Sequence, residues 1–179
     1  MNEVAMALQA PFEAHDIEWR SQQAGAKNNK PWAMVLAYVT NRAIMARLDE
    51  VFGPLGWQNE YRDIDGGKGV ECGISVYDSS SNQWVTKWDA ADSTQVEATK
   101  GGRSGSMKRA AVQWGIGRYL YNLDATFAQC FAGNMPNNVR AVKTKFKGNG
   151  CQDIYGYFIV PELPSWALPI QKQQTNAGI

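Results

Sequence analysis

The sequence predicts an α+β fold in which a three-stranded antiparallel meander packs on a long helix, with N-terminal helices before this β-β-β-α core and a C-terminal extension after it. Three strand-like runs follow one another between residues 57 and 88, separated by turn sequences. Helical periodicity precedes them at residues 39–51. Helix-forming residues follow them as far as residue 120.

The N-terminal third is predicted to be mainly helix and loop. Residues 2–10 have a helical pattern that stops at Pro11, and a second segment, residues 17–20, leads into a polar loop at residues 21–30. Between residues 39 and 51 the apolar side chains recur at steps of three and four residues, which is the helical period. These side chains are Val39, Ala43, Ile44, Leu48 and Val51. A helix is therefore expected there, ending at the glycines and proline of residues 53–56.

The meander is predicted from three runs and the turns between them. Residues 57–64 end at Asp65-Gly66-Gly67, which is a tight-turn sequence. Residues 70–77 alternate cleanly and place Val70, Cys72, Ile74 and Val76 on one face. A polar turn at residues 78–82 leads to the third run, residues 84–88. Clean alternation indicates an antiparallel sheet with one buried face.

A long helix is expected after the meander. Thr94 and Glu97 have the spacing of a capping box, and the helix is predicted to be interrupted near Gly101-Gly102 and to resume from Lys108 to Leu120. Its apolar stripe is expected to lie on the sheet. This stripe consists of Met107, Ala110, Ala111, Trp114 and Tyr121. Trp57, Trp84 and Trp114 are assigned to the packing between sheet and helix.

The remainder of the chain shows weaker patterns. Residues 124–150 are predicted to be rich in loops, residues 154–160 to add a strand, and residues 161–169 to be extended because prolines recur in them. No repeat or linker divides the sequence. Residues 1–170 are therefore predicted to form one domain, and the polar residues 171–179 a disordered tail.

Charge is distributed unevenly along the chain. The formal net charge of the chain is +1. Residues 87–147 carry ten Lys or Arg and four Asp or Glu, a net charge of +6. The other residues carry eight Lys or Arg and thirteen Asp or Glu, a net charge of −5. Residues 100–121 hold five cations and no acid, namely Lys100, Arg103, Lys108, Arg109 and Arg118. Such an asymmetry indicates a local polyanion site on an otherwise acidic body. The alternative is a surface helix with a solvated basic face.

Enzymatic chemistry finds little support in the sequence. No Gly-Lys-Ser/Thr triplet follows the glycines, as a phosphate-binding loop requires, and Gly115-Ile-Gly117 is not a dinucleotide fingerprint. His15 is the single histidine. Asp89, Asp92 and Glu97 are candidate Mg²⁺ ligands for a nuclease, although the capping box explains Glu97 better. We therefore predict a protein that is not an enzyme and that needs no cofactor or metal.

Cysteine usage and hydropathy indicate the compartment. The three cysteines, Cys72, Cys130 and Cys151, lack the spacing of a metal or redox motif, and an odd number fits a reducing compartment. The longest apolar run, residues 32–39, is too short to span a bilayer. We therefore predict a cytoplasmic protein, of a bacterial or phage-infected cell, with no membrane partner.

Several sequence blocks occur together in a fixed order between Ala7 and Leu123. They are Ile17-Glu-Trp-Arg20, Tyr38-Val-Thr-Asn-Arg42, Leu48-Asp-Glu-Val-Phe-Gly-Pro-Leu-Gly-Trp57, Met107-Lys-Arg-Ala-Ala and Trp114-Gly-Ile-Gly-Arg-Tyr-Leu-Tyr121. In these blocks the chain resembles the single-strand DNA annealing proteins of the Rad fifty-two family. The blocks and the meander between them cover about two thirds of the sequence.

The resemblance implies a ring or helical arc of identical subunits with single-stranded DNA along a basic groove. In that family an Arg on the helix before the sheet and a Lys on the helix that packs on the sheet hold the DNA backbone. They match Arg42 and Lys108, and Arg109 matches a further basic position. The next cation of the eukaryotic pattern falls at Val112, and the turn at residues 78–82 lacks the cation of the eukaryotic outer DNA site. The short annealing domain of phage and bacterial recombinases fits better.

The expected function is ATP-independent binding and annealing of complementary DNA strands in homologous recombination or DNA repair. Its expected DNA-binding residues are Arg42, Lys108, Arg109, Arg103, Lys100 and Arg118. The expected partners are single-stranded DNA and further copies of the chain, and an exonuclease or the host single-strand binding protein is a candidate partner. The alternatives are a module that protects single strands without annealing them and, with less support, a metal-dependent nuclease.

Overall fold

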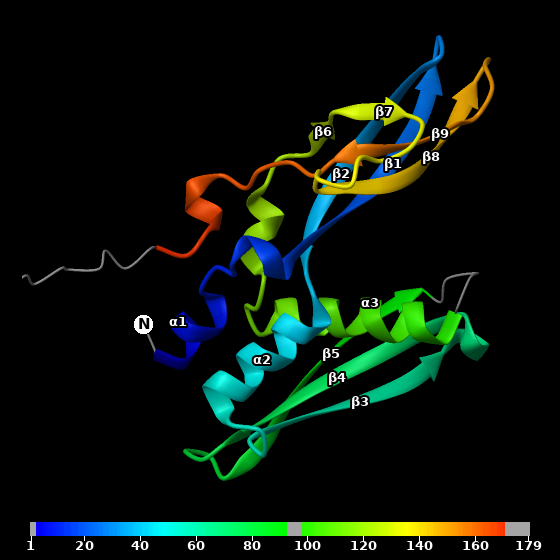
Figure 1. The fold of residues 1–179 in the computed structure, drawn as a ribbon. Helices are drawn as coiled ribbons and strands as arrows, with labels where there is room; N and C mark the ends of the chain where they lie inside the picture. Colours follow the sequence, from blue (N-terminus) through cyan, green and yellow to red (C-terminus); the bar gives the residue numbers. More distant parts are fainter. Residues whose placement is uncertain (1–2, 93–97, 171–179) are drawn as a thin grey trace, which may run out of the picture.

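The computed structural model describes residues 3–92 and 98–170, with the backbone alone at residues 98–100. Its architecture is α+β, which confirms the predicted class. A three-stranded antiparallel sheet carries helix α3, and a six-stranded sheet lies on the other side of this helix (Figure 1). The predicted capping box at Thr94 and Glu97 and the predicted tail at residues 171–179 lie outside the described residues.

The three-stranded sheet consists of β3 (Trp57–Ile64), β4 (Gly69–Asp78) and β5 (Gln83–Asp92), with β4 in the centre. Both pairings are antiparallel. The alternating side chains of β4 at residues 70, 72, 74 and 76 are all buried. Trp57 is half-buried against the same core. Trp84 was expected in that core, but its side chain is 44% exposed and lies against Tyr77 on the outer face. Trp84 pairs with Tyr77, which alternates with the buried residues of β4, so the Trp84 side chain points away from the helix.

Helix α3 (Ala98–Gln113) packs on β4 and β5. It runs through Gly101 and Gly102 without a break, contrary to the predicted interruption. It also ends at Gln113 rather than at Leu120, because Gly115 and Gly117 have positive φ angles of 95° and 69°. A short 3-10 helix, η3 (Arg118–Asn122), follows. Tyr121 in η3 is 72% exposed and does not belong to the predicted apolar stripe.

The N-terminal region contains less helix than the sequence predicts. After α1 (Glu3–Gln9) and the single turn η1 (Ala14–Asp16), a long hairpin forms from β1 (Ile17–Lys27) and β2 (Lys30–Val39). The polar loop predicted at residues 21–30 is thus strand and turn. Its two-residue turn, Asn28-Asn29, has φ angles of 52° and 59°, which asparagine tolerates better than most residues. Helix α2 (Asn41–Phe52) follows directly and is capped by the Thr40 hydroxyl, which accepts a hydrogen bond from Ala43 N at 3.2 Å.

The C-terminal region adds strands where loops were expected. Strands β6 (Thr126–Ala128), β7 (Cys130–Ala132), β8 (Ala141–Asn149) and β9 (Ile154–Ile159) join the hairpin in the order β6-β2-β1-β8-β9-β7. The two edge strands, β6 and β7, are separated in sequence by Gln129 alone, and β7 also contacts β2. The sheet therefore curls round on itself into a small barrel. The segment predicted as extended, residues 161–169, contains one 3-10 turn, η4 (Ser165–Ala167).

Two hydrophobic clusters result from this arrangement. One lies between the three-stranded sheet, α3, α2 and the N-terminal segment, and Leu48, Ile74 and Met107 are among its fully buried members. The other fills the barrel and centres on Phe146 and Phe158. Strand β1 belongs to both clusters, because Ile17 lies in the first and Trp19, two residues later, lies in the second. The base of the hairpin is therefore the place where the two parts of the molecule meet.

Candidate nucleic-acid interface

Lys108 lies where α3 meets the base of the hairpin. Its Nζ is 4.2 Å from the centre of the Tyr38 ring. Tyr38 lies near the end of strand β2, shortly before α2 begins. On the hairpin, Tyr38 pairs directly with Glu18, and Arg20 follows two residues later on the same face of β1. An ammonium above an aromatic face is held by the ring quadrupole. The Lys108 side chain is therefore positioned by a strand that the sequence analysis did not foresee.

Burial and two opposite charges set the electrostatic surroundings of Lys108. Burial lowers the pKa of Lys108, the carboxylate of Glu18 raises it, and the guanidinium of Arg20 lowers it. Burial and then the hydrogen bond to Glu18 raise the pKa of Tyr38 to about 12. A partly desolvated ammonium has more to gain from a phosphate than a fully hydrated lysine has, and Glu18, whose effect on Lys108 exceeds that of Arg20, offsets part of this gain. The arrangement suits a phosphate lying between α3 and the hairpin.

Arg42 lies in the first turn of α2, two residues after the Thr40 cap. Its side chain is exposed, and within the described parts of the chain it forms no hydrogen bond or ion pair. It lines a hollow of about 330 Å³ between α2 and the segment that contains Phe12 and Asp16. Lys108 does not line this hollow, whose other charged side chains are Asp16, Arg47 and Glu50.

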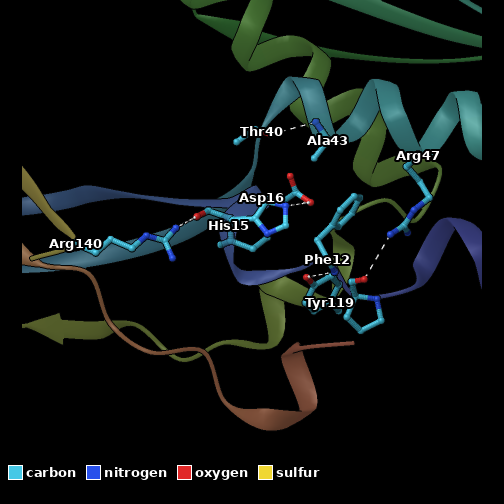
Figure 2. A network of polar contacts seen from close by, with 10 residues as sticks. Phe12, His15, Asp16, Thr40, Ala43, Arg47, Tyr119 and Arg140 are labelled. Carbon is cyan, nitrogen blue, oxygen red and sulfur yellow. Dashed lines mark hydrogen bonds and ion pairs between the residues drawn. The ribbon is translucent and has the colours of Figure 1, made fainter. Parts of the chain in front are cut away.

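A network of polar contacts joins α2, the N-terminal segment and the base of the hairpin (Figure 2). Arg47 of α2 donates to the carbonyl oxygens of Ala7 and Ala10, each at 2.8 Å, and its guanidinium lies 4.0 Å from the Phe12 ring centre. The Tyr119 hydroxyl accepts from Phe12 N at 3.0 Å, and Arg140 donates to the carbonyl of Ile17. The exposed His15 lies 3.6 Å from Asp16. Arg47 and Arg140 are therefore committed to holding chain segments together, whereas Arg42 is not.

The other predicted cations lie in different surroundings. Arg109 is exposed, and within the described residues it forms no ion pair or hydrogen bond. It follows Lys108 by about 100° around the helix, on the side away from the buried Met107 and Ala110. Arg103 is also exposed, but its guanidinium lies 5.5 Å from the ring of Tyr61 on β3. Lys100 belongs to α3, and its side chain lies outside the described part of the structure.

Arg118, the first residue of η3, is engaged with the end of the preceding helix α3. Its Nε donates to Val112 O at 2.9 Å and its Nη2 to Gln113 O at 2.8 Å. Lys87 Nζ also donates to Gln113 O, at 3.0 Å, and lies 4.4 Å from the Trp114 ring centre. Cations at a helix C-terminus satisfy the last carbonyl groups and complement the helix dipole. This local role accounts for Arg118 without any ligand.

The acids considered for Mg²⁺ do not converge in the described residues. Asp89 accepts from Ala90 N at 2.8 Å and from Gln113 Nε2 at 3.2 Å. No group of three His, Cys, Asp or Glu able to hold a metal occurs in residues 3–92 and 98–170. Within the same residues no helix is long and apolar enough to cross a membrane.

Sequence reasoning missed Arg20, Glu18 and Tyr38 as neighbours of Lys108. The signal was present in Ile17-Glu-Trp-Arg20, where buried and exposed side chains alternate as in a strand with one covered face. Their distance from Lys108 in the sequence, about 70 to 90 residues, left no local pattern to join them. Only the packing of the hairpin on α3 brings them together.

Comparison with known proteins identifies the family. The model of the Rad52/22 family of double-strand break repair proteins matches residues 1–138. The chain belongs to the Rad52/22 family. This confirms the resemblance found in the sequence blocks, and it covers α1, the hairpin, α2, the three-stranded sheet and α3.

Two bacterial proteins that are similar to this chain have names that state a function. The single-stranded DNA-binding protein DdrA of Deinococcus radiodurans is 32% identical over 182 residues, which cover 99% of this chain and 73% of the relative. The protein of the same name from Deinococcus deserti is 32% identical over 130 residues, which cover 69% of this chain and 59% of the relative. The match to the first relative extends through the barrel strands β8 and β9, beyond the family model.

Proposed function

We propose that this chain binds single-stranded DNA without sequence preference and anneals complementary strands without ATP, in homologous recombination or DNA repair. The observation that carries the proposal is the half-buried Lys108, held on Tyr38 where α3 meets the hairpin. Membership of the Rad52/22 family and the name of the DdrA relatives support the same ligand.

The proposed groove runs along the junction between the barrel and the unit made of β3–β5 and α3. Lys108 and Arg109 on α3, Arg42 on α2 and Arg20 on β1 would contact successive phosphates. Contacts to the backbone position a strand without reading its bases, so binding should be independent of sequence. The bases would remain free to pair with a second strand, and residues 1–170 would act as one annealing domain.

Oligomerisation follows from the small number of cations in one groove. A single copy offers about four cations, and repeating the groove in a ring or arc multiplies the contacts along one strand. We therefore infer that the active form is a homo-oligomer. Light scattering of the purified protein with and without oligo(dT) tests this, and a monomer that anneals DNA at full rate would contradict it.

A strand-annealing assay separates annealing from simple protection. Two complementary oligonucleotides, one labelled with a donor and one with an acceptor fluorophore, are mixed without ATP or Mg²⁺. We expect the wild-type protein to accelerate pairing and Lys108→Ala to lose most of the acceleration. Slower pairing in the presence of wild-type protein would show a protecting module instead.

A further inference from the structure

The outer wall of the barrel, which the groove does not use, carries a row of lysines. Lys143, Lys145 and Lys147 alternate along β8 and are all exposed, because the intervening Phe146 points into the barrel and is fully buried. Lys143 and Lys147 form no ion pair within the described residues. Lys145 lies 2.9 Å from Asp153, and this contact raises the pKa of Lys145. Successive outward residues of a strand are about 6.6 Å apart, so the row presents evenly spaced charges.

Aromatic rings share this wall with the lysines. Tyr155 on β9 pairs with Lys145, and Tyr157 pairs with Lys143. Phe131 on β7 pairs with Tyr157, and their rings stack with centres 5.4 Å apart and an angle of 20°. Paired residues of neighbouring strands point to the same side of a sheet, so these rings lie on the same face as the lysines, where Tyr157 is buried at 8% exposure. Tyr155 is 68% exposed and Phe131 is 37% exposed.

A hollow lies beside the exposed ring of Tyr155. Its volume is about 580 Å³, and its lining includes the loop of Gly133, Asn134 and Met135 together with Lys143 and Lys145. This volume falls within the range of about 300–1,000 Å³ of sites that take drug-sized ligands, a size class that includes a nucleotide. The hollow therefore places a cation, an aromatic face and room for a base within one site.

We propose that this wall of β7, β9 and β8 is a second contact for single-stranded DNA, separate from the groove at Lys108. The lysines hold phosphates, and a base stacks on Tyr155 beside the loop of residues 133–135. Exposed rings interleaved with cations are the means by which proteins bind single strands without reading sequence. The inference shares its ligand with the proposed function but rests on different residues, so either one can fail alone.

Affinity for a fluorescein-labelled dT oligonucleotide, measured across a salt series, tests the wall. We expect the double variant Lys143→Gln/Lys147→Gln to lower the log–log salt slope by about 1.4, since each phosphate contact on a single strand contributes about 0.7. We expect Tyr155→Leu to weaken binding by about fivefold or more, from the loss of one stacked base. Lys68→Gln and Tyr121→Leu serve as controls, because Lys68 is exposed in the turn before β4 and Tyr121 is 72% exposed.

Photocrosslinking adds a readout that a change in overall charge would not produce. An oligonucleotide containing 5-iododeoxyuridine crosslinks to aromatic side chains on which its base stacks, and peptide mapping should find Tyr155 in the wild type and in Lys108→Ala. Unchanged affinity and salt slope in folded wall variants, with no crosslink at residues 131–157, would overturn the inference and leave the groove intact. If the wall variants lose DNA binding and Lys108→Ala keeps it, the wall is a DNA contact and the proposed groove at Lys108 is wrong.

Discussion

Lys108 links DNA binding to a cost in stability. Its pKa in the folded protein is lowered by burial, so in alkaline solution the folded lysine loses its proton at a lower pH than the unfolded one. A lysine with a lowered folded pKa destabilises the fold at neutral pH, where it stays charged, and the cost is relieved as the pH rises through the folded value. The wild-type free energy of unfolding should therefore gain a contribution from Lys108 as the solution becomes alkaline.

The variant Lys108→Met tests this linkage, because methionine retains an apolar stem that can contact the Tyr38 ring. We expect the variant to unfold at the same or a higher temperature than the wild type at neutral pH, while it loses DNA affinity. The stability difference between the two proteins should shrink as the pH approaches and passes the lowered pKa. Arg109→Met is the control, since Arg109 is exposed and no such pH-dependent difference is expected. A clearly less stable Lys108→Met would argue that the lysine is structural.

Arg47 and Arg42, five residues apart on α2, should divide into a structural and a functional role. The Arg47 side chain is 10% exposed and donates to carbonyl groups at the end of α1, which its loss would leave unpaired. We expect Arg47→Met to reduce the free energy of unfolding by about 1–3 kcal/mol in urea titration. Arg42→Met should change it by less than about 0.5 kcal/mol and weaken DNA binding instead. Equal stability of the two variants would contradict this division.

At the scale of elements, the end of α3 depends on Gly117. Its φ angle is 69°, and a Cβ on it would lie 2.6 Å from Val39 Cγ2 at the base of the hairpin. Gly66, with a φ angle of 65°, has no atom within 4 Å of such a Cβ. Gly66→Ala should therefore cost only the left-handed strain of about 1–2 kcal/mol, and Gly117→Ala clearly more. Thermal unfolding of both variants measures the difference, and equal losses would show that Val39 moves aside freely.

The elements predicted best from the sequence were those with a clean local period. The strand of residues 57–64 was predicted with its observed bounds, and the alternation at residues 70–76 gave the buried face of β4. The hairpin was missed because small residues hide the alternation there. Gly25, for example, is covered by the Trp32 ring, which lies 3.1 Å from the position of a Cβ on that glycine. The turn of Asn28-Asn29 was the remaining local signal.

Glycines in α3 were misread for a related physical reason. The sequence predicts an interruption near Gly101 and Gly102, since glycine in a helix interior costs about 1 kcal/mol relative to alanine, but the helix is continuous there. Along this helix a Cβ on Gly105 would lie 3.0 Å from the Cβ of Ala91 on β5. Glycine there lets the helix approach the sheet closely, and tertiary packing outweighs the local preference. Such a contact between residues 14 positions apart cannot be seen in a local pattern.

For the candidate site, the sequence identified cations but not their surroundings. Arg42 and Arg109 are exposed and Lys108 lies against Tyr38, whereas Arg118 is occupied by the carbonyl groups of Val112 and Gln113. The charge pattern alone cannot separate the exposed Arg109 from the engaged Arg118, because both belong to the same basic run at residues 100–121. The partners that decide between them come from folding.

At the scale of the whole molecule, the structure joins two differently built parts. The sheet of β3–β5 with α3 and α2 lies on one side of the junction, and the barrel lies on the other (Figure 1). Lys108 lies at the junction, and Lys143, Lys145 and Lys147 lie on the barrel. A strand held by both would follow the hairpin from its base toward its tip, because β8 runs parallel to β1.

Whether Lys108 binds the DNA backbone is best decided by the salt dependence of single-stranded DNA affinity for the wild type and Lys108→Met. Each protein is titrated with labelled oligo(dT) at several salt concentrations, after circular dichroism has shown that both are folded. We expect weaker binding by the variant and a log–log slope shallower by about 0.7 for each Lys108 contact that is lost along the strand. An unchanged affinity and slope in the folded variant would contradict the assignment of the groove.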